Sequence, residues 1–215
     1  MNSFFSQTSL KDYISCPYKY KLKYIDKIYW FQQNNISLKK GSDFHLAAER
    51  YFSEIPNLSN PTIDKWLEKL KKDFPINKDE IYLPEYILNY SEHNINLKAR
   101  YDLLILKKDE IQIIDFKTNI KTLNKEKQNE DIQTKVYSFV LANYLSLFKN
   151  NGYSLNNITM IYWQPDFEII SIPYSLEKHI EYGMLFKNLS NEIQSSKFNK
   201  TNNCKNCEFK SFCLK

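Results

Sequence analysis

Four cysteines constrain the fold of this chain more than any other feature of its sequence. Cys16 lies near the start, whereas Cys204, Cys207 and Cys213 lie close to the end. If all four bind one metal centre, the two ends of the chain must meet. The sequence shows no charged start followed by an apolar run, so we expect a soluble, cytoplasmic protein. Disulfides are rare in that compartment, and clustered cysteines there are typical of metal binding.

The residues around Cys16 favour a metal-binding thiolate. Pro17 disfavours helical geometry at the residue before it and suits the first position of a new helix. We therefore expect Cys16 at a break just ahead of a helix N-terminus, where the thiolate form is favoured. Four thiolates suit a tetrahedral zinc ion as well as an iron–sulfur cluster, so the residue types alone leave both open.

Positive charge is concentrated in the two segments that carry the cysteines. The whole chain has a net charge of +5. Residues 1–40 hold seven lysines against two aspartates, and residues 197–215 hold five lysines against one glutamate. The intervening 41–196 is therefore net negative, at −4. If the ends meet, they form one basic lobe that suits a phosphate backbone; the alternative is ordinary solvated lysine on helix surfaces.

The pattern of apolar residues predicts a mixed α/β fold. At 215 residues, the chain is long enough for a single domain with a substantial core. Helical periodicity predicts a short helix capped by Ser9 and longer helices at 42–53, 62–73, 130–149 and 175–195. Short apolar runs between polar breaks predict strands at 81–90, 96–107, 110–117, 157–163 and 167–172. This order predicts a mixed central β-sheet flanked by helices, and we expect no membrane span.

The second and third expected strands form a hairpin that brings two acidic residues together. With Lys108 and Asp109 at its tip, Asp102 lies directly opposite Asp115. Opposed side chains in such a pair have Cβ atoms about 5 Å apart. Two carboxylates at that separation repel each other unless a cation lies between them.

The third strand also carries a lysine beside one of these acids. Asp115 and Lys117 lie two residues apart and share a strand face, whereas Ile114 and Phe116 suit the core. Magnesium or manganese prefers oxygen ligands and retains bound waters. A nearby lysine can orient or deprotonate an attacking water, or stabilise the charged transition state. Taken alone, Asp-x-Lys at a strand end is more often a surface ion pair, but the combination suits phosphodiester hydrolysis.

The ordered set of motifs resembles the PD-(D/E)xK nuclease superfamily, in particular its RecB/AddB-like branch with an iron–sulfur cluster. It is also similar to the CRISPR adaptation nuclease. The resemblance covers nearly the whole chain. It rests on LKDYISCPYKYKLKY, Gly41-Ser-Asp-Phe-His45, Ala99-Arg-Tyr-Asp102, Ile114-Asp115-Phe116-Lys117-Thr118, Gln133-Thr-Lys-Val-Tyr137, and Cys204-Lys-Asn-Cys207 followed by Cys213. The branch often has glycine where Ala99 stands.

The resemblance implies a role for each matched residue. His45, Asp102 and Asp115 would hold magnesium or manganese, and Lys117 would be the catalytic lysine. Gln133 and Tyr137 would position the DNA or the active-site groups. Glu85 matches more loosely an acidic residue of the preceding strand, and its alternative is a charge at the sheet edge.

The resemblance also implies an architecture. A restriction-endonuclease-like core would occupy residues 41–196. Residues 1–40 and 197–215 would together form a basic lobe within the same domain. Its cysteines, Cys16, Cys204, Cys207 and Cys213, would hold a 4Fe-4S cluster, with zinc as the alternative.

The expected function is that of a metal-dependent DNA nuclease. It would act as an exonuclease on single strands or duplex ends in DNA repair or recombination, beside a separate helicase. One alternative is a CRISPR adaptation nuclease that processes spacer precursors with its partner proteins. An alternative of another class is a non-catalytic, cluster-stabilised DNA-binding module.

Overall fold

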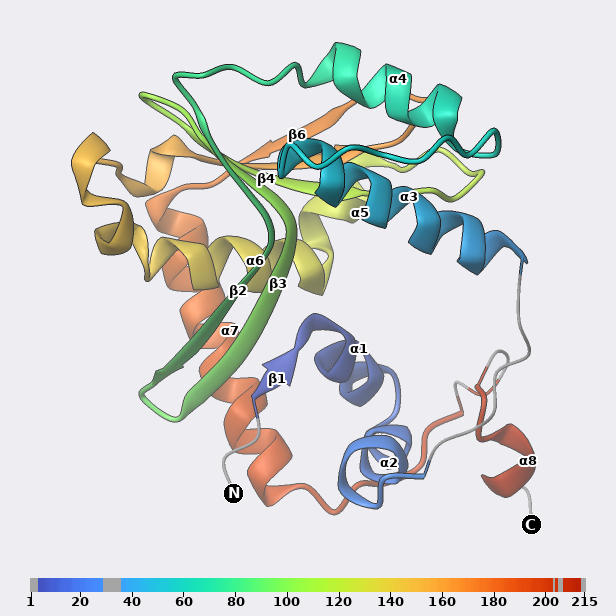
Figure 1. Ribbon diagram of the computed structural model, residues 1–215. Coiled ribbons are helices and arrows are strands. Elements are labelled where there is room, and N and C mark those ends of the chain that lie inside the picture. Colours follow the sequence, from blue (N-terminus) through green and yellow to red (C-terminus); the bar gives the residue numbers. More distant parts are fainter. Residues whose placement is uncertain (1–3, 29–35, 203, 205–206, 214–215) are drawn as a thin grey trace.

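The computed structural model describes residues 4–28, 36–202, 204 and 207–213 (Figure 1). Its strands are β1 (Phe5–Ser6), β2 (Ile81–Glu92), β3 (Ile95–Leu106), β4 (Ile111–Phe116), β5 (Ile158–Trp163) and β6 (Ile170–Pro173). Its α-helices are α1 (Gln7–Ser15), α2 (Pro17–Tyr20), α3 (Ile36–Phe52), α4 (Asp64–Asp73), α5 (Lys125–Glu130), α6 (Ile132–Ala142), α7 (Leu176–Ser195) and α8 (Lys210–Cys213). A π-helical turn (Lys21–Ile25) and two 3₁₀ segments (Leu145–Asn151, Leu155–Asn157) complete the described elements.

The strands form one mixed sheet in which β3 is the central member. It pairs antiparallel with β2 along one edge. Along the other edge it pairs with both β1 and β4, which lie at different levels: Leu97 faces Phe5 of β1, and Leu103 faces Ile114 of β4. Beyond β4 follow β5, which runs parallel to it, and β6, which runs antiparallel to β5. This confirms the expected mixed sheet.

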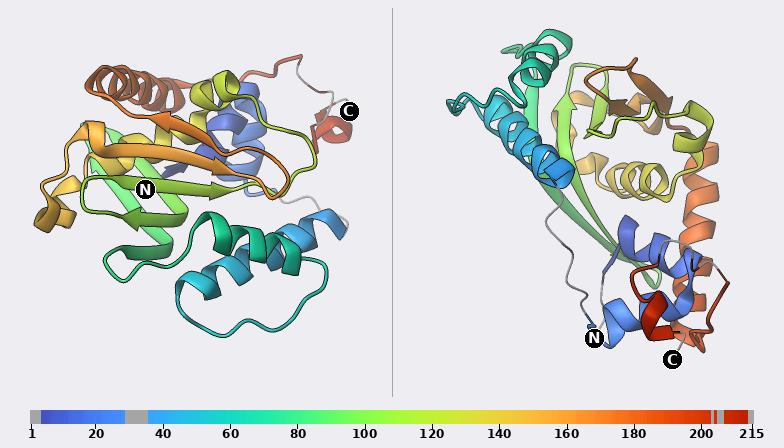
Figure 2. Two further views of the ribbon diagram at one scale, coloured as in Figure 1. Left: turned by 90° about the horizontal axis from the view of Figure 1, so that it is seen from above. Right: turned by 90° about the vertical axis from the view of Figure 1, so that its right-hand side faces the viewer.

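Helices cover both faces of the sheet, as the two views of Figure 2 show. Helices α6 and α7 pack with one face, where Ile111 and Ile113 of β4 are fully buried. Helices α3 and α4 pack with the other, which receives Ile114 and Phe116. Strands that are buried on both faces have continuous runs of apolar residues. This is why apolar and polar residues alternate so little in β4. None of the helices in the described residues is long and apolar enough to cross a membrane.

Three helix predictions are wrong in their boundaries. The helix expected at 42–53 begins six residues earlier, at Ile36. The expected helix at 130–149 is instead α5, α6 and a 3₁₀ segment, and Leu147 in that segment is 58% exposed. The helix ends because Asn143 takes the C-cap position and its side chain donates a hydrogen bond to the carbonyl of Phe139. At the start of the chain, Ser6 rather than Ser9 is the N-cap, and Ser9 completes the capping box from the third helical position.

The two ends of the chain lie at the same end of the molecule (Figure 1). The backbone N–H of Tyr18 donates to the carbonyl of Asn199 (3.3 Å), and the hydroxyl of Thr201 donates to the carbonyl of Ser15 (3.0 Å). We call the described residues 4–28 and 197–213 the terminal lobe. Helix α3 begins at Ile36, so it crosses the boundary that the sequence analysis set at residue 40.

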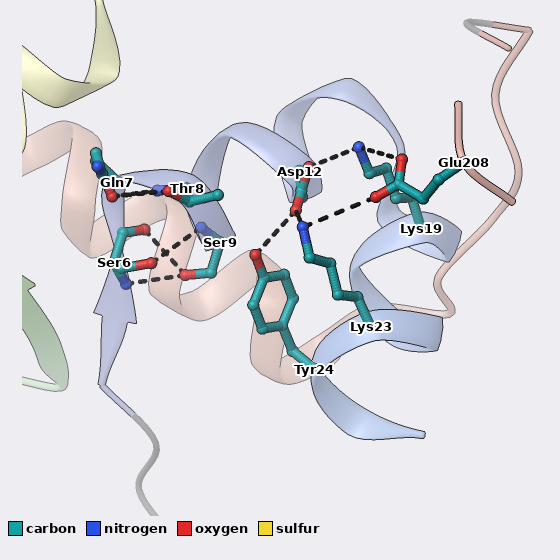
Figure 3. A network of polar contacts seen from close by, with 9 residues as sticks. All are labelled: Ser6, Gln7, Thr8, Ser9, Asp12, Lys19, Lys23, Tyr24 and Glu208. Carbon is teal, nitrogen blue, oxygen red and sulfur yellow. Dashed lines mark hydrogen bonds and ion pairs between the residues drawn. The ribbon is translucent and has the colours of Figure 1, made fainter. Parts of the chain in front are cut away.

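A network of charges ties the terminal lobe together (Figure 3). Asp12 of α1 pairs with Lys19 (2.8 Å) and Lys23 (2.9 Å) and accepts a hydrogen bond from the hydroxyl of Tyr24. Lys19 also pairs with Glu208, 3.0 Å away, in the C-terminal segment. Burial opposes ionisation of Asp12, but the hydrogen bonds from Lys19, Lys23 and Tyr24 lower its pKa below the ordinary value. The network thus joins residues nearly 200 positions apart in sequence without using a cysteine.

Candidate active site

The β3–β4 hairpin has the register that the sequence predicts. Leu103 pairs with Ile114 and Leu106 with Ile111, so Asp102 stands across from Asp115 just beyond the last paired residues. The carboxylate of Asp102 accepts a hydrogen bond from the backbone N–H of Phe116 (2.8 Å). This bond fixes one oxygen of Asp102 at the end of β4.

Asp115, Lys117 and Gln133 form a closed polar triangle. The ammonium of Lys117 lies 2.7 Å from Oδ2 of Asp115 and donates to Oε1 of Gln133 (2.9 Å). The other end of the Gln133 amide donates from Nε2 to Oδ1 of Asp115. Asp131 caps α6 and accepts from the backbone N–H of Gln133 (2.7 Å), so the start of α6 holds the amide in place. The structure thus brings together three residues that the motifs singled out.

His45, Glu85 and Asp102 form a second group beside this triangle. Each offers a ligand atom, and the three atoms lie within 4.8 Å of one another. His45 Nδ1 is 3.5 Å from Asp102 Oδ2. The third carboxylate of the predicted site, Asp115, lies outside this group and turns to Lys117 and Gln133 instead. Glu85, which the motifs matched only loosely, therefore lies together with His45 and Asp102, whereas Asp115 does not.

The backbone of Glu85 is in an unusual conformation. It has a φ of +50°, although its neighbours Pro84 and Tyr86 keep regular antiparallel pairing with β3. A positive φ is uncommon for residues other than glycine, and such strain often accompanies functional sites. Here it occurs at the residue facing Asp102 across the strand pair. Sequence patterns carry no signal for this distortion.

Gly41 allows α3 to lie close to the end of β4. A Cβ atom at this position would stand 2.8 Å from the hydroxyl oxygen of Thr118, closer than such atoms approach in real structures. His45 lies one turn further along α3, on the same side of the helix. The glycine therefore sets how closely the imidazole approaches the carboxylates.

The electrostatics of the site depend on burial and on the number of acidic groups. Asp115 is 3% exposed. Burial, and then the charge of Asp102, raise its pKa to about 6 despite the opposing effect of Lys117. Burial opposes protonation of His45, but the charges of Asp102, Asp115 and Glu85 raise its pKa above the ordinary value. Burial raises the pKa of Glu85, as it does that of Asp115. The positive groups of the protein therefore do not fully compensate the negative charge of Asp102, Asp115 and Glu85.

One cavity of about 540 Å³ joins His45 and Asp102 to Asp115, Lys117 and Gln133, whereas Glu85 lines an adjoining cavity that shares His45 and Arg100 with it. The first of these cavities is lined by His45, Asp102, Asp115, Lys117, Gln133 and Tyr137, together with Ser6, Gln7, Thr8, Ile87, Lys98, Arg100 and Phe116. Tyr137 belongs to this wall, and its backbone carbonyl accepts from the buried hydroxyl of Tyr101 (3.0 Å). The sequence analysis missed Lys98 and Arg100, although their alternation with Leu97, Ala99 and Tyr101 was a signal that they face away from the core.

The donor set of this cavity fits a hard divalent cation. Carboxylate oxygens with one imidazole are ligands that such ions accept. In addition, Oδ2 of Asp115 is buried; the Lys117 ammonium lies 2.7 Å from it, and His45 adds a weaker compensating charge. An ion bound by His45, Glu85 and Asp102 would reduce the mutual repulsion of the carboxylates.

The four cysteines line a second cavity, of about 210 Å³, in the terminal lobe. All four are free of disulfides. Cys16 lies at the break between α1 and α2, and Pro17 begins the new helix, as the sequence predicts. Burial opposes ionisation of Cys16, but hydrogen bonds from Lys19 and Thr201 lower the pKa of its thiol. Within the described part of the chain, no three cysteine sulfurs lie within 4.8 Å of one another.

Comparison with known proteins assigns the family. A sequence model of the PD-(D/E)XK nuclease superfamily matches residues 4–214. The chain belongs to this superfamily. It is therefore a nuclease, and nucleases of this superfamily generally use divalent metals such as magnesium or manganese. The group of His45, Glu85 and Asp102 provides a site for such an ion.

Solved structures agree with this fold. A crystal structure of a "putative exonuclease" from Eubacterium rectale has a TM-score of 0.60 at 12% identity, and the match covers 98% of this chain and 88% of that one. The structure of a protein named SSO0001 has a lower TM-score of 0.45 at 17% identity, with coverage of 98% of this chain and 85% of that one. Among curated proteins, none matches the sequence significantly.

Proposed function

We propose that this PD-(D/E)XK nuclease is a magnesium- or manganese-dependent enzyme that hydrolyses phosphodiester bonds of DNA. The observation that carries the proposal is the convergence of two groups at one site. One is the Asp115–Lys117–Gln133 triangle, and the other is the potential ligand set of His45, Glu85 and Asp102, of which His45 and Asp102 share the cavity with the triangle. A simple surface ion pair would not require a buried carboxylate at the end of a strand.

The chain's residues divide into ligands and positioning groups. His45, Asp102 and Asp115 would hold the ion, as would Glu85, whose strained backbone supports a functional role. When bound, such an ion polarises the phosphoryl oxygen and lowers the pKa of a coordinated water. Lys117 would orient the attacking water or stabilise the charge that develops on the phosphate.

Gln133 and Tyr137 would act from α6. Gln133 bonds both members of the Asp115–Lys117 pair, so it fixes their relative orientation. Tyr137 lines the cavity one helical turn later. Burial, and then the charges of Asp115 and Asp102, raise the pKa of its hydroxyl. The hydroxyl therefore remains a neutral hydrogen-bond donor for a substrate phosphate at physiological pH.

The test is cleavage of end-labelled DNA with manganese, with magnesium and with a chelator. We expect Asp115→Asn and Lys117→Gln each to lower the rate by about 100-fold or more, because both act on charge in the transition state. Asp109→Asn is the matched control, since Asp109 is exposed at the tip of the same hairpin. Full cleavage by both active-site variants would contradict the proposal. DNA binding without cleavage by the wild-type protein would support the non-catalytic binding module.

Exonuclease action on single strands or duplex ends is the form of the activity that we favour. It is supported by the likeness to the Eubacterium rectale protein, whose description names an exonuclease. Circular and linear substrates distinguish the modes, because an exonuclease leaves a covalently closed circle intact. Equal cleavage of both would favour an endonuclease, such as a CRISPR adaptation nuclease acting on spacer precursors. We further propose a role in DNA repair or recombination, in the cytoplasm and beside a separate helicase.

We propose that Cys16, Cys204, Cys207 and Cys213 hold a 4Fe-4S cluster. The argument is one of size. Zinc–sulfur bonds of about 2.3 Å would hold four sulfurs only about 3.8 Å apart. The sulfurs share one cavity, but within the described residues no three of them meet within 4.8 Å, and this wider spacing suits a larger group. Four cysteine thiolates are the usual ligands of such a cluster.

Anaerobic purification followed by metal analysis and a visible spectrum tests this assignment. We expect iron and acid-labile sulfide in equal amounts, with a broad visible absorption that Cys16→Ser removes. Zinc with a featureless spectrum would contradict the cluster but retain a metal site. Absence of both metals from anaerobically prepared protein would remove the site altogether.

A further inference from the structure

The burial of the two faces of strand β3 changes at Asp102. After this residue both faces of the strand are buried, from Leu103 to Leu106. Before it the faces differ: Leu97, Ala99 and Tyr101 lie in the core, whereas Lys98 and Arg100 are exposed on the same face as Asp102. A basic stripe therefore leads directly to the proposed metal ligands.

The two cations of this stripe line the active-site cavity and are incompletely paired. Lys98 makes no ion pair or side-chain hydrogen bond with the described residues, although it shares a cavity with two aspartates. Arg100 has one charged contact, from Nε to Oε2 of Glu85 at 3.3 Å, and its side chain is 66% exposed. The remaining N–H groups of the guanidinium are thus available to a ligand. Cations with this arrangement fit anionic groups that enter the cavity.

The first turn of α1 forms the neighbouring wall of this stripe. Strand β1 runs parallel to β3 with Ser6 paired to Lys98, and the helix begins at the next residue, Gln7. Ser6, Gln7 and Thr8 all line the cavity and lie at the start of α1 (Figure 3). The amino end of a helix carries partial positive charge, although the N–H groups of Thr8 and Ser9 already donate to Gln7 Oε1 and Ser6 Oγ. The terminal lobe therefore contributes a wall to the same cavity as the nuclease core.

We propose that Lys98 and Arg100 bind two successive phosphates of one extended DNA strand, next to the phosphate that is cleaved. The proposal rests on the proposed function and specifies how that site holds its substrate. Residues two apart on a strand are separated by about 6.6 Å. That repeat is comparable to the separation of neighbouring phosphates in an extended single strand. The strand runs from the metal ligands along β3 towards the first turn of α1.

The decisive variant is Lys98→Gln, because Lys98 contacts none of the proposed metal ligands. We expect KM for a short single-stranded oligonucleotide to rise by about tenfold, the loss of one phosphate contact, with kcat nearly unchanged. The slope of the logarithm of the DNA-binding constant against the logarithm of salt concentration should decrease in magnitude by about one unit. Arg100→Gln should raise KM similarly but also lower kcat, since Arg100 contacts Glu85. Lys187→Gln is the matched control, because Lys187 is exposed on α7 and does not line this cavity.

A neutral phosphate analogue identifies the contact. A single methylphosphonate, moved stepwise along the oligonucleotide, should weaken wild-type binding most at two adjacent positions on one side of the cleaved bond. At one of these positions the methylphosphonate should not weaken DNA binding by the Lys98→Gln variant any further, because the variant has already lost that contact. Fluorescence anisotropy measures the binding, so the result does not depend on cleavage.

The outcomes separate this inference from the proposed function. If the wild-type enzyme cleaves DNA and Lys98→Gln leaves both KM and the salt slope unchanged, the phosphate path is wrong while the function stands. If the wild-type protein does not cleave, the function fails, and anisotropy still tests the path. Equal losses from Lys98→Gln and Lys187→Gln would indicate general charge attraction and would overturn the specific assignment.

Discussion

The active-site cavity and the terminal lobe are built by different means. The candidate metal ligands and catalytic side chains of the active site project from or next to β2, β3, β4, α3 and α6, and the apolar cores on the two faces of the sheet fix those elements, while the start of α1 adds a further wall. The lobe is assembled from both chain ends, which are joined by the Asp12–Lys19–Glu208 network and a cavity lined by cysteines. The comparison indicates that hydrophobic packing holds the catalytic groups in place. In the lobe, Leu10, Tyr13 and Tyr20 join the same core, whereas the attachment of the C-terminal segment depends largely on charges and on whatever the cysteines bind.

The largest expected effect separates the two regions directly. Cys16→Ser should remove the bound metal of the lobe and expose residues 197–213 to limited proteolysis, because structural metals contribute about 10 kcal/mol or more to such sites. The core should keep its cooperative melting transition, measured by circular dichroism. Loss of the whole fold in this variant would contradict the division into two differently stabilised regions.

Gly41→Ala tests the geometry of the cavity. The added methyl group would meet the Thr118 hydroxyl at 2.8 Å, so either the Thr118 side chain must turn away at the end of β4 or α3 must shift and carry His45 with it. We expect activity to fall by about tenfold or more, because misplacement by a fraction of an ångström weakens catalysis.

Gly183→Ala is the matched control for this change. Its added carbon would meet only Phe139, at an ordinary 3.4 Å, in the interior of α7. Alanine there should retain activity and stabilise the helix by up to about 1 kcal/mol. Equal activity of the two alanine variants would show that the close approach at Gly41 has no catalytic role.

Asp73 provides a pH test within the core. It accepts hydrogen bonds from the indole N–H of Trp163 (2.7 Å) and from Lys69 (2.9 Å). Burial opposes its ionisation, but these bonds lower its pKa. Its stabilising effect should therefore be complete above the ordinary aspartate pKa and disappear as pH falls through the lowered value. Urea unfolding should show that Asp73→Asn costs about 1 kcal/mol at pH 7 and little in acid. An equal cost at both pH values would contradict this.

The smallest effect concerns the charges of the lobe. Glu208→Gln removes the partner of Lys19 in the C-terminal segment, but Glu208 is partly exposed and the pair is screened by solvent. We expect it to cost at most about 1 kcal/mol, and less in high salt. Metal-free protein should show faster proteolysis of the C-terminal segment in this variant than in Glu192→Gln, an exposed control on α7. No difference would assign the joining of the two ends to the cysteines alone.

The sequence predicted the parts of the site that follow from local spacing. The hairpin register, and so the opposition of Asp102 and Asp115, followed from placing Lys108 and Asp109 at the tip, because where β3 and β4 pair both faces are buried and apolar periodicity does not select a register. Helical spacing put Gln133 and Tyr137 on one face of α6. The positive φ of Glu85 and the contact of Gly41 with Thr118 depend on tertiary approach, for which sequence spacing gives no measure. The link from Asp12 through Lys19 to Glu208 likewise depends on tertiary approach.

Manganese binding, measured by isothermal titration calorimetry, tests the central claim most directly. We predict that wild-type protein binds the ion, that Asp102→Asn and His45→Ala lose this binding, and that Lys117→Gln keeps it while losing cleavage. Unchanged affinity in Asp102→Asn and His45→Ala would contradict the claim that these side chains form one metal-dependent active site.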